Sequence, residues 1–473
     1  MRPLLGALLF FTSSSFAQDS VKLSGNIVNR ASDSLVVTYN DNRIAYYPNE
    51  FFARIDDKGN FSLAFPVPHG VYTQATIVNG SRRTELILHA GDSLTMTADA
   101  RHFDSTIHFN GRGCEIQNFI VSHTMAMGRI NTYATKVKTD INKEPADFLK
   151  AIANEKNVET DFLNKHKAGL PPSFISFWEQ LFVYYNYFFI EQYPQTHAMV
   201  KVRRYTDTIP DANFSVVAQL PNAFNDSLLQ VPSYLLYLTG VFEIKLKAAG
   251  YSYRTGDTAA YRRFQDSVVS LVYKLMPSKS AEFYLAQNLY GRARNQPLEK
   301  TENMYAAFKK RWPKSEYLLM LDKQVALAER LAPGQPAPDF DIITPDGKHT
   351  KLSELKGKVV YIDFWASWCK QCVGEIIKGA KMKELLRKKP LEFVYVSIDN
   401  DTTADNMLIE KYKMEGLFTH ATGAWNAREV QLYGVTSLPA YFLIDEYGKF
   451  AMQNPPTFLQ STELILAIEK LFR

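Results

Sequence analysis

The pattern of hydrophobic and polar positions changes twice along the chain and so divides it into three regions. Between residues 21 and 110, short alternating runs such as Leu35 to Tyr39 and Thr84 to Leu88 stand between turns rich in Asp, Gly and Pro. Short strands at this spacing are typical of two packed antiparallel sheets. We therefore predict a β-sandwich-like domain over residues 21–110.

Helical periods replace this alternation after residue 113. On one predicted helix, large apolar residues recur every three or four positions: Phe174, Phe177, Trp178, Leu181, Phe182, Tyr185, Phe188 and Phe189. Such a stripe is typical of a helix face packed on other helices, although it could also hold an apolar ligand. Further helices are expected over residues 232–249, 258–275, 280–290, 300–311 and 315–331. The pattern thus predicts a central all-α region over residues 115–331.

A proline-rich segment, Pro333 to Pro338, ends the helical region and predicts a stiff linker. Strands and helices alternate after it, which is typical of a mixed α/β sheet. The expected elements of this C-terminal domain, residues 333–473, are a hairpin at 342–350, strands at 358–365 and 391–398, a second hairpin at 440–453, and helices at 369–387, 402–415 and 461–472.

The first residues have the features of a secretory signal peptide. Arg2 is followed by an apolar run from Leu4 to Phe11, and small residues stand at Ser15 and Ala17. We expect a signal peptide over residues 1–17, cut after Ala17, and a mature protein in the periplasm or cell envelope. No later stretch has about 18 uninterrupted apolar residues, the length that a membrane-spanning helix needs.

Composition narrows the class of protein further. The chain has 473 residues, 46% of them hydrophobic and 22% charged, which is typical of a multidomain globular protein. The net charge of +5 is spread along the chain, so we expect no nucleic-acid partner. There are three cysteines, and two of them, Cys369 and Cys372, are close in sequence, which indicates redox chemistry rather than structural disulfides. The third, Cys114, could pair with another chain, act as a redox partner or be a small buried residue.

The two neighbouring cysteines lie where a strand ending at Trp365 is expected to meet a helix. Thiol-disulfide exchange needs a thiolate, and the N–H groups and dipole of a helix start lower a cysteine pKa from about 8.5. Cys369 should therefore attack, and Cys372, one turn further on, should resolve the mixed disulfide. Lys370 adds positive charge beside the nucleophile. A zinc site would need a second ligand pair, which the sequence does not offer, and a structural disulfide is the other alternative.

Residues 361–369 followed by Cys372, including Trp368 before the first cysteine, resemble the active-site strand and loop of the thioredoxin superfamily. Residues 333–340, 346–347 and 352–358 resemble its TlpA/ResA branch of exported oxidoreductases. The resemblance covers about residues 331–473, and the N-terminal part is similar to the accessory region of multidomain members. It implies a thioredoxin-like fold without a cofactor, protein disulfides or dithiols as substrates, and a membrane or periplasmic electron donor.

Three further residues match the family pattern. Pro439 stands where the family has a cis-proline, whose neighbouring backbone faces the disulfide and pairs with substrate. Asp363 matches the buried acid that assists proton transfer to the resolving cysteine, or it is a partly solvated carboxylate at a strand end. Glu375 matches an acidic residue common after the motif in this branch, or it lies on a solvated helix face.

Two departures from the family pattern affect the expected direction of electron flow. Lys370 and Gln371 replace the usual Gly-Pro pair, and Ile377 replaces a helix-kinking proline. Residues between the cysteines tune the reduction potential, so the direction stays open. We expect an exported thiol-disulfide oxidoreductase whose main reaction is to reduce protein disulfides rather than to oxidise protein dithiols. The alternatives are a thiol peroxidase, although the Thr and Pro of its motif are missing upstream of Cys369, and a partner-binding envelope protein with an appended redox domain.

Overall fold

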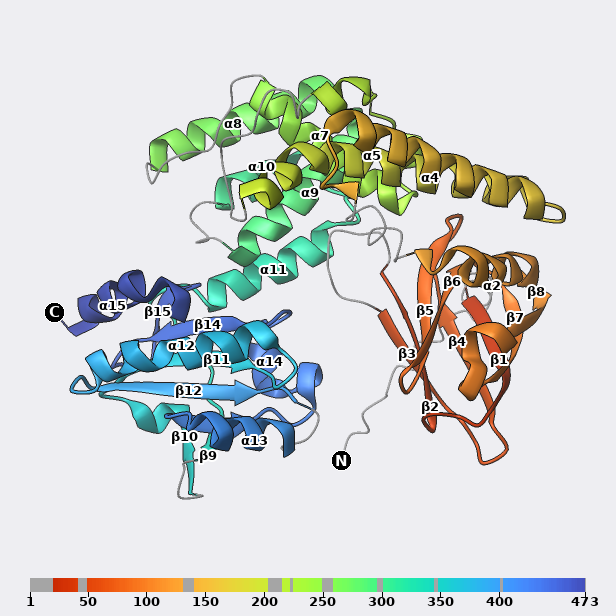
Figure 1. Cartoon of the computed structure of the whole chain (residues 1–473). Helices are drawn as coiled ribbons and strands as arrows, with labels where there is room; N and C mark the ends of the chain where they lie inside the picture. Colours follow the sequence, from red (N-terminus) through yellow and green to blue (C-terminus); the bar gives the residue numbers. More distant parts are fainter. Residues whose placement is uncertain are drawn as a thin grey trace, which may run out of the picture. The chain divides into compact units, whose positions relative to one another are not determined.

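The computed structural model describes residues 20–40, 49–130, 140–202, 215–221, 224–248, 258–295, 301–343, 348–399 and 403–472. The expected signal peptide and the expected turn at residues 345–347 lie outside these ranges. The chain divides into two units, the first ending at Tyr284 and the second starting at Leu285 (Figure 1). Helix α9 (Ser278–Asn295) carries the chain from one unit to the next.

Among the residues described, eight strands form two four-stranded sheets in the first unit, with the orders β4-β1-β7-β8 and β3-β2-β5-β6. The strands are β1 (Ser20–Val28), β2 (Ser34–Tyr39), β3 (Asn49–Arg54), β4 (Asn60–Pro66), β5 (Thr73–Asn79), β6 (Arg82–Leu88), β7 (Ser93–Asp99) and β8 (His108–Arg112). The turn η1 (Ala100–His102) and the short helix α1 (Phe103–Thr106) connect β7 to β8. Alternate residues of β7 are buried in one core shared by both sheets, as the period-two pattern predicts.

Helices follow the sandwich. They are α2 (Cys114–Met127), α4 (Pro145–His166), α5 (Pro172–Val202), α7 (Pro232–Ala248), α8 (Thr258–Leu275), α9, α10 (Glu302–Arg311) and α11 (Leu318–Arg330), with 3-10 turns η3 (Ser215–Gln219) and η4 (Asp226–Leu228). The first of them, α2, is bound to the sandwich, because the Gln117 amide donates to the Ile87 carbonyl at 2.7 Å and accepts from its N–H at 3.2 Å. Within the described part of the chain, no helix is both long enough and apolar enough to cross a membrane.

Most of the apolar stripe of α5 is buried, as its spacing predicts, and Tyr185 and Phe188 are partly buried. The Trp178 ring packs against Phe119 of α2, with centroids 4.9 Å apart, and Phe174 packs against both Phe119 and Tyr72. The stripe therefore covers part of the sandwich as well as its neighbouring helices. Tyr72 precedes β5 in a stretch whose sequence shows no helical period, so the pattern alone did not reveal this contact.

The C-terminal part is a seven-stranded mixed sheet with the order β10-β9-β13-β12-β11-β14-β15. The strands are β9 (Asp341–Ile343), β10 (His349–Lys351), β11 (Val359–Trp365), β12 (Leu391–Ser397), β13 (Leu417–His420), β14 (Ala440–Ile444) and β15 (Phe450–Gln453). Every residue of β11 is buried, because the strand lies between β12 (parallel) and β14 (antiparallel) in the middle of the sheet. This is the mixed α/β sheet that the alternation of elements predicts, in the thioredoxin-like fold that the family resemblance implies.

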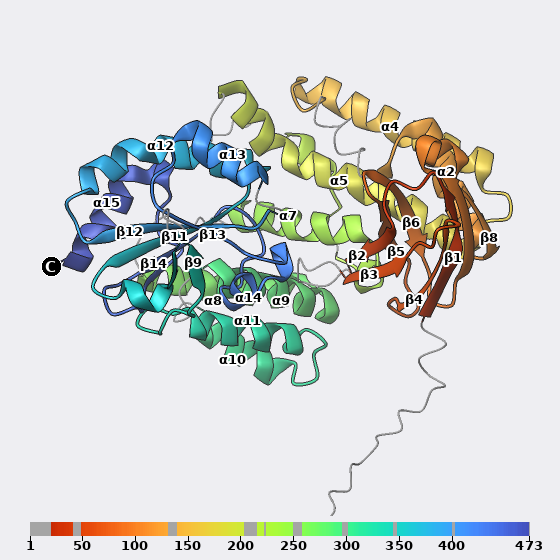
Figure 2. The ribbon, with the colours of Figure 1, turned by 90° about the horizontal axis from the view of Figure 1, so that it is seen from below.

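Helices cover both faces of this sheet. They are α12 (Lys370–Leu386), α13 (Thr403–Tyr412), α14 (Arg428–Leu432) and α15 (Ser461–Glu469), with 3-10 turns η6 (Leu352–Leu355), η7 (Ala424–Asn426), η8 (Phe458–Gln460) and η9 (Lys470–Phe472). Helix α12 packs against α15 and η8, and Figure 2 shows α12 and α15 on one side of the sheet and α14 on the other. The sequence prediction lacks strand β13 and helix α14. Each is only four or five residues long, which is too short to show a hydrophobic period.

The proline-rich segment is not a free linker, which corrects the sequence prediction. The Gly334 N–H donates to the Phe450 carbonyl at 2.8 Å, and the Phe450 N–H donates to the Gln335 carbonyl at 2.8 Å. Prolines leave few N–H groups in this segment. Besides the Gly334 N–H, the Ala337 N–H donates to the Gly448 carbonyl at 3.0 Å, just before β15, and the Gln335 N–H donates to the Ala332 carbonyl at 3.1 Å. The helix before it is also attached to the domain, since Leu331 is buried in the C-terminal core and Arg330 donates to the Leu432 carbonyl at 2.8 Å.

Candidate active site

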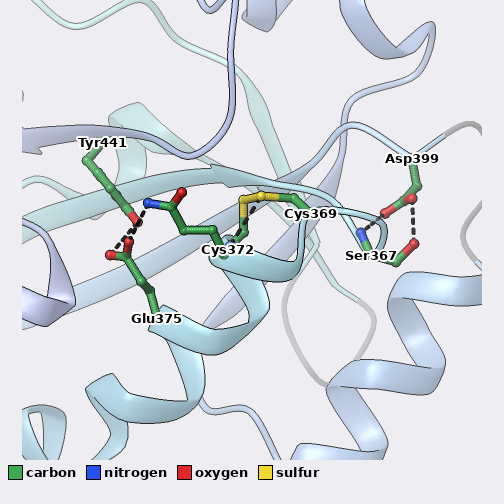
Figure 3. Close-up of a disulfide and its surroundings, with 7 residues drawn as sticks. Ser367, Cys369, Cys372, Glu375, Asp399 and Tyr441 are labelled. Carbon is green, nitrogen blue, oxygen red and sulfur yellow. Dashed lines mark hydrogen bonds between the residues drawn. A yellow bond between two sulfur atoms is a disulfide. The ribbon is translucent and has the colours of Figure 1, made fainter. Parts of the chain in front are cut away.

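The two cysteines lie at the junction between β11 and α12, and they form a disulfide (Figure 3). Cys369 is the N-cap of α12, and its Sγ accepts a hydrogen bond from the Cys372 N–H at 3.2 Å. Cys372 lies in the first turn and is fully buried, whereas Cys369 retains 9% of its surface. The structure therefore places the first cysteine at the N–H groups of a helix start and the second more deeply, as the sequence predicts.

The turn that leads to Cys369 is held by a carboxylate from the neighbouring strand. Asp399 accepts hydrogen bonds from the N–H and the hydroxyl of Ser367, both at 2.7 Å (Figure 3). It also accepts one from the hydroxyl of Ser397 at 3.1 Å. Sequence reasoning missed Asp399. The parallel pairing of β11 and β12 sets Ser397 opposite Trp365, so the residues that follow the two strands lie side by side. This pairing is the feature from which Asp399 could have been found.

Pro439 lies at the same end of the sheet. The Leu438–Pro439 peptide bond is cis, as expected from the family pattern. Strand β14 begins at the next residue, Ala440, which pairs with Phe364 near the end of β11. Pro439 and Gln371, which stands between the two cysteines, line one groove. The sheet therefore brings the cis-proline beside the disulfide.

Two carboxyl groups are buried behind the disulfide, on β11 and on α12. Asp363 is fully buried, and within the described residues neither of its oxygens has a hydrogen-bond partner. Burial, and then the nearby charge of Glu375, raise the pKa of Asp363 well above its usual value. Glu375 is 2% exposed and accepts hydrogen bonds from Gln371 at 3.0 Å and from the Tyr441 hydroxyl at 2.9 Å. The solvated alternatives for Asp363 and Glu375 are therefore wrong.

A lysine reaches the same buried region from the middle of α12. The Lys383 ammonium donates to the Tyr395 hydroxyl at 2.8 Å and to the Glu415 carbonyl at 3.0 Å. Burial lowers the pKa of Lys383 to about 8, although the charges of Glu415 and Asp363 act in the opposite direction. Burial also raises the pKa of Tyr441, so this hydroxyl keeps its proton and donates to Glu375. Sequence reasoning missed Lys383, Tyr395 and Tyr441, because they come from three separate elements.

The remaining expected site residues lie on the surface. The Trp368 side chain is 57% exposed and faces Trp425, with ring centroids 6.3 Å apart. Lys370 is exposed at the first position of α12. Ile377 is 41% exposed within the same helix. Cys114 is a free, partly exposed cysteine at the start of α2, where it packs against the sandwich core.

A thioredoxin-like sheet with a cysteine pair at the start of its central helix and a cis-proline beside that pair defines the class of thiol-disulfide oxidoreductases. The comparisons with known proteins agree. The Redoxin family matches residues 332–459. The chain is 30% identical over 125 residues to the thiol-disulfide oxidoreductase ResA of Bacillus thuringiensis, covering 26% of this chain and 70% of that protein.

It is also 30% identical over 133 residues to ResA of Bacillus subtilis, covering 28% of this chain and 73% of that protein. The chain belongs to the family of the ResA thiol-disulfide oxidoreductases. Among solved structures, the thioredoxin domain of a thiol-disulfide oxidoreductase from Bacteroides vulgatus is 26% identical, with a TM-score of 0.27, and the match covers 30% of this chain and 99% of that one.

Proposed function

We propose that Cys369 and Cys372 perform the exchange and that the enzyme reduces disulfides of other proteins. The Cys369 thiolate attacks one sulfur of the substrate disulfide, which forms a mixed disulfide and releases the other substrate sulfur as a thiolate. The Cys372 thiolate then attacks the Cys369 sulfur, which closes the Cys369–Cys372 disulfide and releases the second substrate thiolate. Two electrons pass to the substrate, and the two protons that the enzyme's thiols lose on forming thiolates balance those that the released substrate thiolates take up. The greater exposure of Cys369 and its N-cap position support this order of attack.

The neighbouring residues have separate roles in this proposal. Asp363 exchanges a proton with Cys372, which the raised pKa of this buried acid supports, and Glu375 belongs to the same buried group of acids. Lys370 favours the Cys369 thiolate by its charge, and the exposed Trp368 contacts the partner protein. The backbone beside Pro439 pairs with the substrate chain.

We further propose that the signal peptide at residues 1–17 exports the protein to the periplasm or cell envelope. There it acts on exported proteins and is reduced again by a membrane or periplasmic donor. The division into domains at residues 21–110, 115–331 and 333–473 belongs to the same proposal, with the first two serving as an accessory region. The observation that carries the proposed chemistry is the disulfide at the N-terminus of α12.

Insulin reduction by dithiothreitol tests the exchange. In the Cys369→Ser variant, the acceleration of insulin reduction by the protein should fall at least about a hundredfold, because no other thiolate lies at this helix start. Cys372→Ala should accumulate a mixed disulfide that mass spectrometry detects, while Cys114→Ser serves as the matched control and keeps the full rate. Insulin reduction that survived Cys369→Ser would contradict the proposal, and consumption of peroxide by the wild-type protein would favour a thiol peroxidase.

The reduction potential of the cysteine pair tests the direction of electron flow. A value near about −270 mV, like that of thioredoxin, supports a reductase, whereas a value near about −120 mV defines an oxidase of dithiols. Equilibration with glutathione buffers, followed by alkylation and mass spectrometry, gives this value directly.

A further inference from the structure

A groove of about 540 Å³ opens beside the cis-proline, and part of its wall comes from helices that precede the thioredoxin-like sheet. One side consists of the loop that ends at Pro439, together with Gln371 between the cysteines. Another side consists of Gln324 and Leu327 of α11 and of Arg294 near the end of α9. All of these residues belong to the second unit.

The α11 wall is attached to the sheet domain. Leu327 lies so close to Gly434, after α14, that a side chain at Gly434 would collide with it. The backbone of Gly434 also has a φ of +62°, which suits glycine. With the hydrogen bond from Arg330 to the Leu432 carbonyl, these contacts keep α11 beside the groove.

Arg294 supplies the charge of this groove. It is the sole charged side chain among the residues that line it. Its Nη2 donates to the Ser437 hydroxyl at 2.9 Å, and in the described part of the chain it has no carboxylate partner. A guanidinium has five N–H donors, so most remain available to a ligand, and a carboxylate can accept two of them at once.

The loop opposite the disulfide offers unpaired polar groups to the same groove. Within the described residues, the backbone groups of Thr436, Ser437 and Leu438 have no backbone partner, since pairing with β11 begins at Ala440. An extended peptide laid along this loop would satisfy these groups as an added strand does.

We propose that Arg294 determines which substrate segments pair with the backbone beside Pro439, and that it selects those that carry Asp or Glu next to the reactive cysteine. The inference rests on the proposed exchange at Cys369, which it refines by naming the class of substrate. Arg294 contacts the flanking segment and no reacting sulfur, so it determines specificity. The helical region before the sheet domain thereby contributes directly to the choice of substrate.

Two cyclic peptides test this assignment. Each holds one intramolecular disulfide, and they differ only in whether Glu or Lys flanks the cysteines. The pre-reduced full-length protein is mixed with each at low ionic strength, and its oxidation is followed by tryptophan fluorescence. The wild-type protein should react roughly tenfold faster with the Glu peptide than with the Lys peptide, because complementary charge speeds encounter and binding. The Arg294→Glu variant should reverse this ratio.

Lys310→Glu is the matched control, because this exposed lysine on α10 lies outside the groove, and it should keep the wild-type ratio. Equal rates for both peptides, or a ratio that Arg294→Glu leaves unchanged, would overturn the assignment. Bis(2-hydroxyethyl) disulfide, which is small and uncharged, separates the two proposals. A wild-type protein that reduces it but does not distinguish the peptides contradicts the groove alone, whereas one that cannot reduce it contradicts the exchange itself.

Discussion

Asp363 and Glu375 are both buried near the disulfide, but their surroundings differ. Glu375 receives hydrogen bonds from Gln371 and Tyr441, whereas Asp363 receives none. Two buried carboxyl groups in one region cannot both ionise cheaply, and the one without donors loses more when it is charged. Burial therefore keeps the proton on Asp363, because it raises the pKa of this carboxyl group well above its usual value.

The stability of the enzyme should consequently fall as pH rises. An unfolded Asp ionises near pH 4, while the folded Asp363 keeps its proton because its pKa is raised. Between these two pKa values unfolding releases a proton, so higher pH favours the unfolded state. The stability advantage of the Asp363→Asn variant over the wild-type protein should grow by up to about 1.4 kcal/mol per pH unit above about pH 4.

Urea unfolding at several pH values between about 5 and 8 measures this difference. Asp341→Asn is the control, because Asp341 is exposed and should show no such slope. A constant difference between Asp363→Asn and the wild-type protein across this range would mean that Asp363 is already ionised in the folded state.

At the level of the element, α12 has two glycines in different surroundings. A Cβ at Gly379 would lie 2.6 Å from the Phe458 ring, while a Cβ at Gly374 would meet no atom within 4 Å. The close approach at Gly379 lets α12 pack on η8 and α15. Gly374 has no such role, so its only effect there is the low helix propensity of glycine.

Alanine at these two positions should therefore change stability in opposite directions. Gly379→Ala should destabilise the protein by about 1–3 kcal/mol, because the Phe458 ring must move. Gly374→Ala should stabilise it by up to about 1 kcal/mol through better helix propensity. Thermal unfolding measures both, and a loss of equal size at both positions would show that the packing against Phe458 is not what distinguishes them.

The sequence predicted the long elements of the C-terminal domain because their hydrophobic periods are strong. The expected strands at 358–365 and 440–444 agree with β11 and β14 within a residue. The two cysteines and Pro439 could be found because each has a fixed place in a local motif. Asp399, Lys383 and Tyr441 could not, because hydrogen bonds between separate elements define their roles and no local spacing records those bonds.

For the whole molecule, hydrophobic contacts cross the composition change at Pro333, where the sequence predicts a domain boundary. Leu331, which follows α11, is buried in the core of the C-terminal sheet, and Leu327 of α11 packs against that core. Contacts between residues before Pro333 and the sheet after it do not repeat along the sequence, so no hydrophobic period reveals them. The last helix before the prolines therefore belongs physically with the thioredoxin-like sheet.

Two fragments test this dependence. The fragment 301–473 should be more stable than 333–473 by at least about 2 kcal/mol, since burial of one leucine alone contributes about 1.5–3 kcal/mol. Urea unfolding compares the two. Leu319→Ala in the longer fragment is the control and should change its stability little, because that side chain of α11 is 67% exposed. Equal stability of the two fragments would contradict the role given to α11.

The hydrogen bonds between Gly334 or Gln335 and Phe450 also have a consequence for solubility. Strand β15 is the outermost strand on its side of the sheet, and an open strand edge is a template on which another chain can polymerise. The proline-rich segment occupies the start of that edge, and prolines themselves offer no N–H to an incoming strand. A chain that began after Pro338 would lack this segment and expose the edge of β15 to pairing with another sheet. The segment therefore helps to keep the enzyme from assembling into fibres.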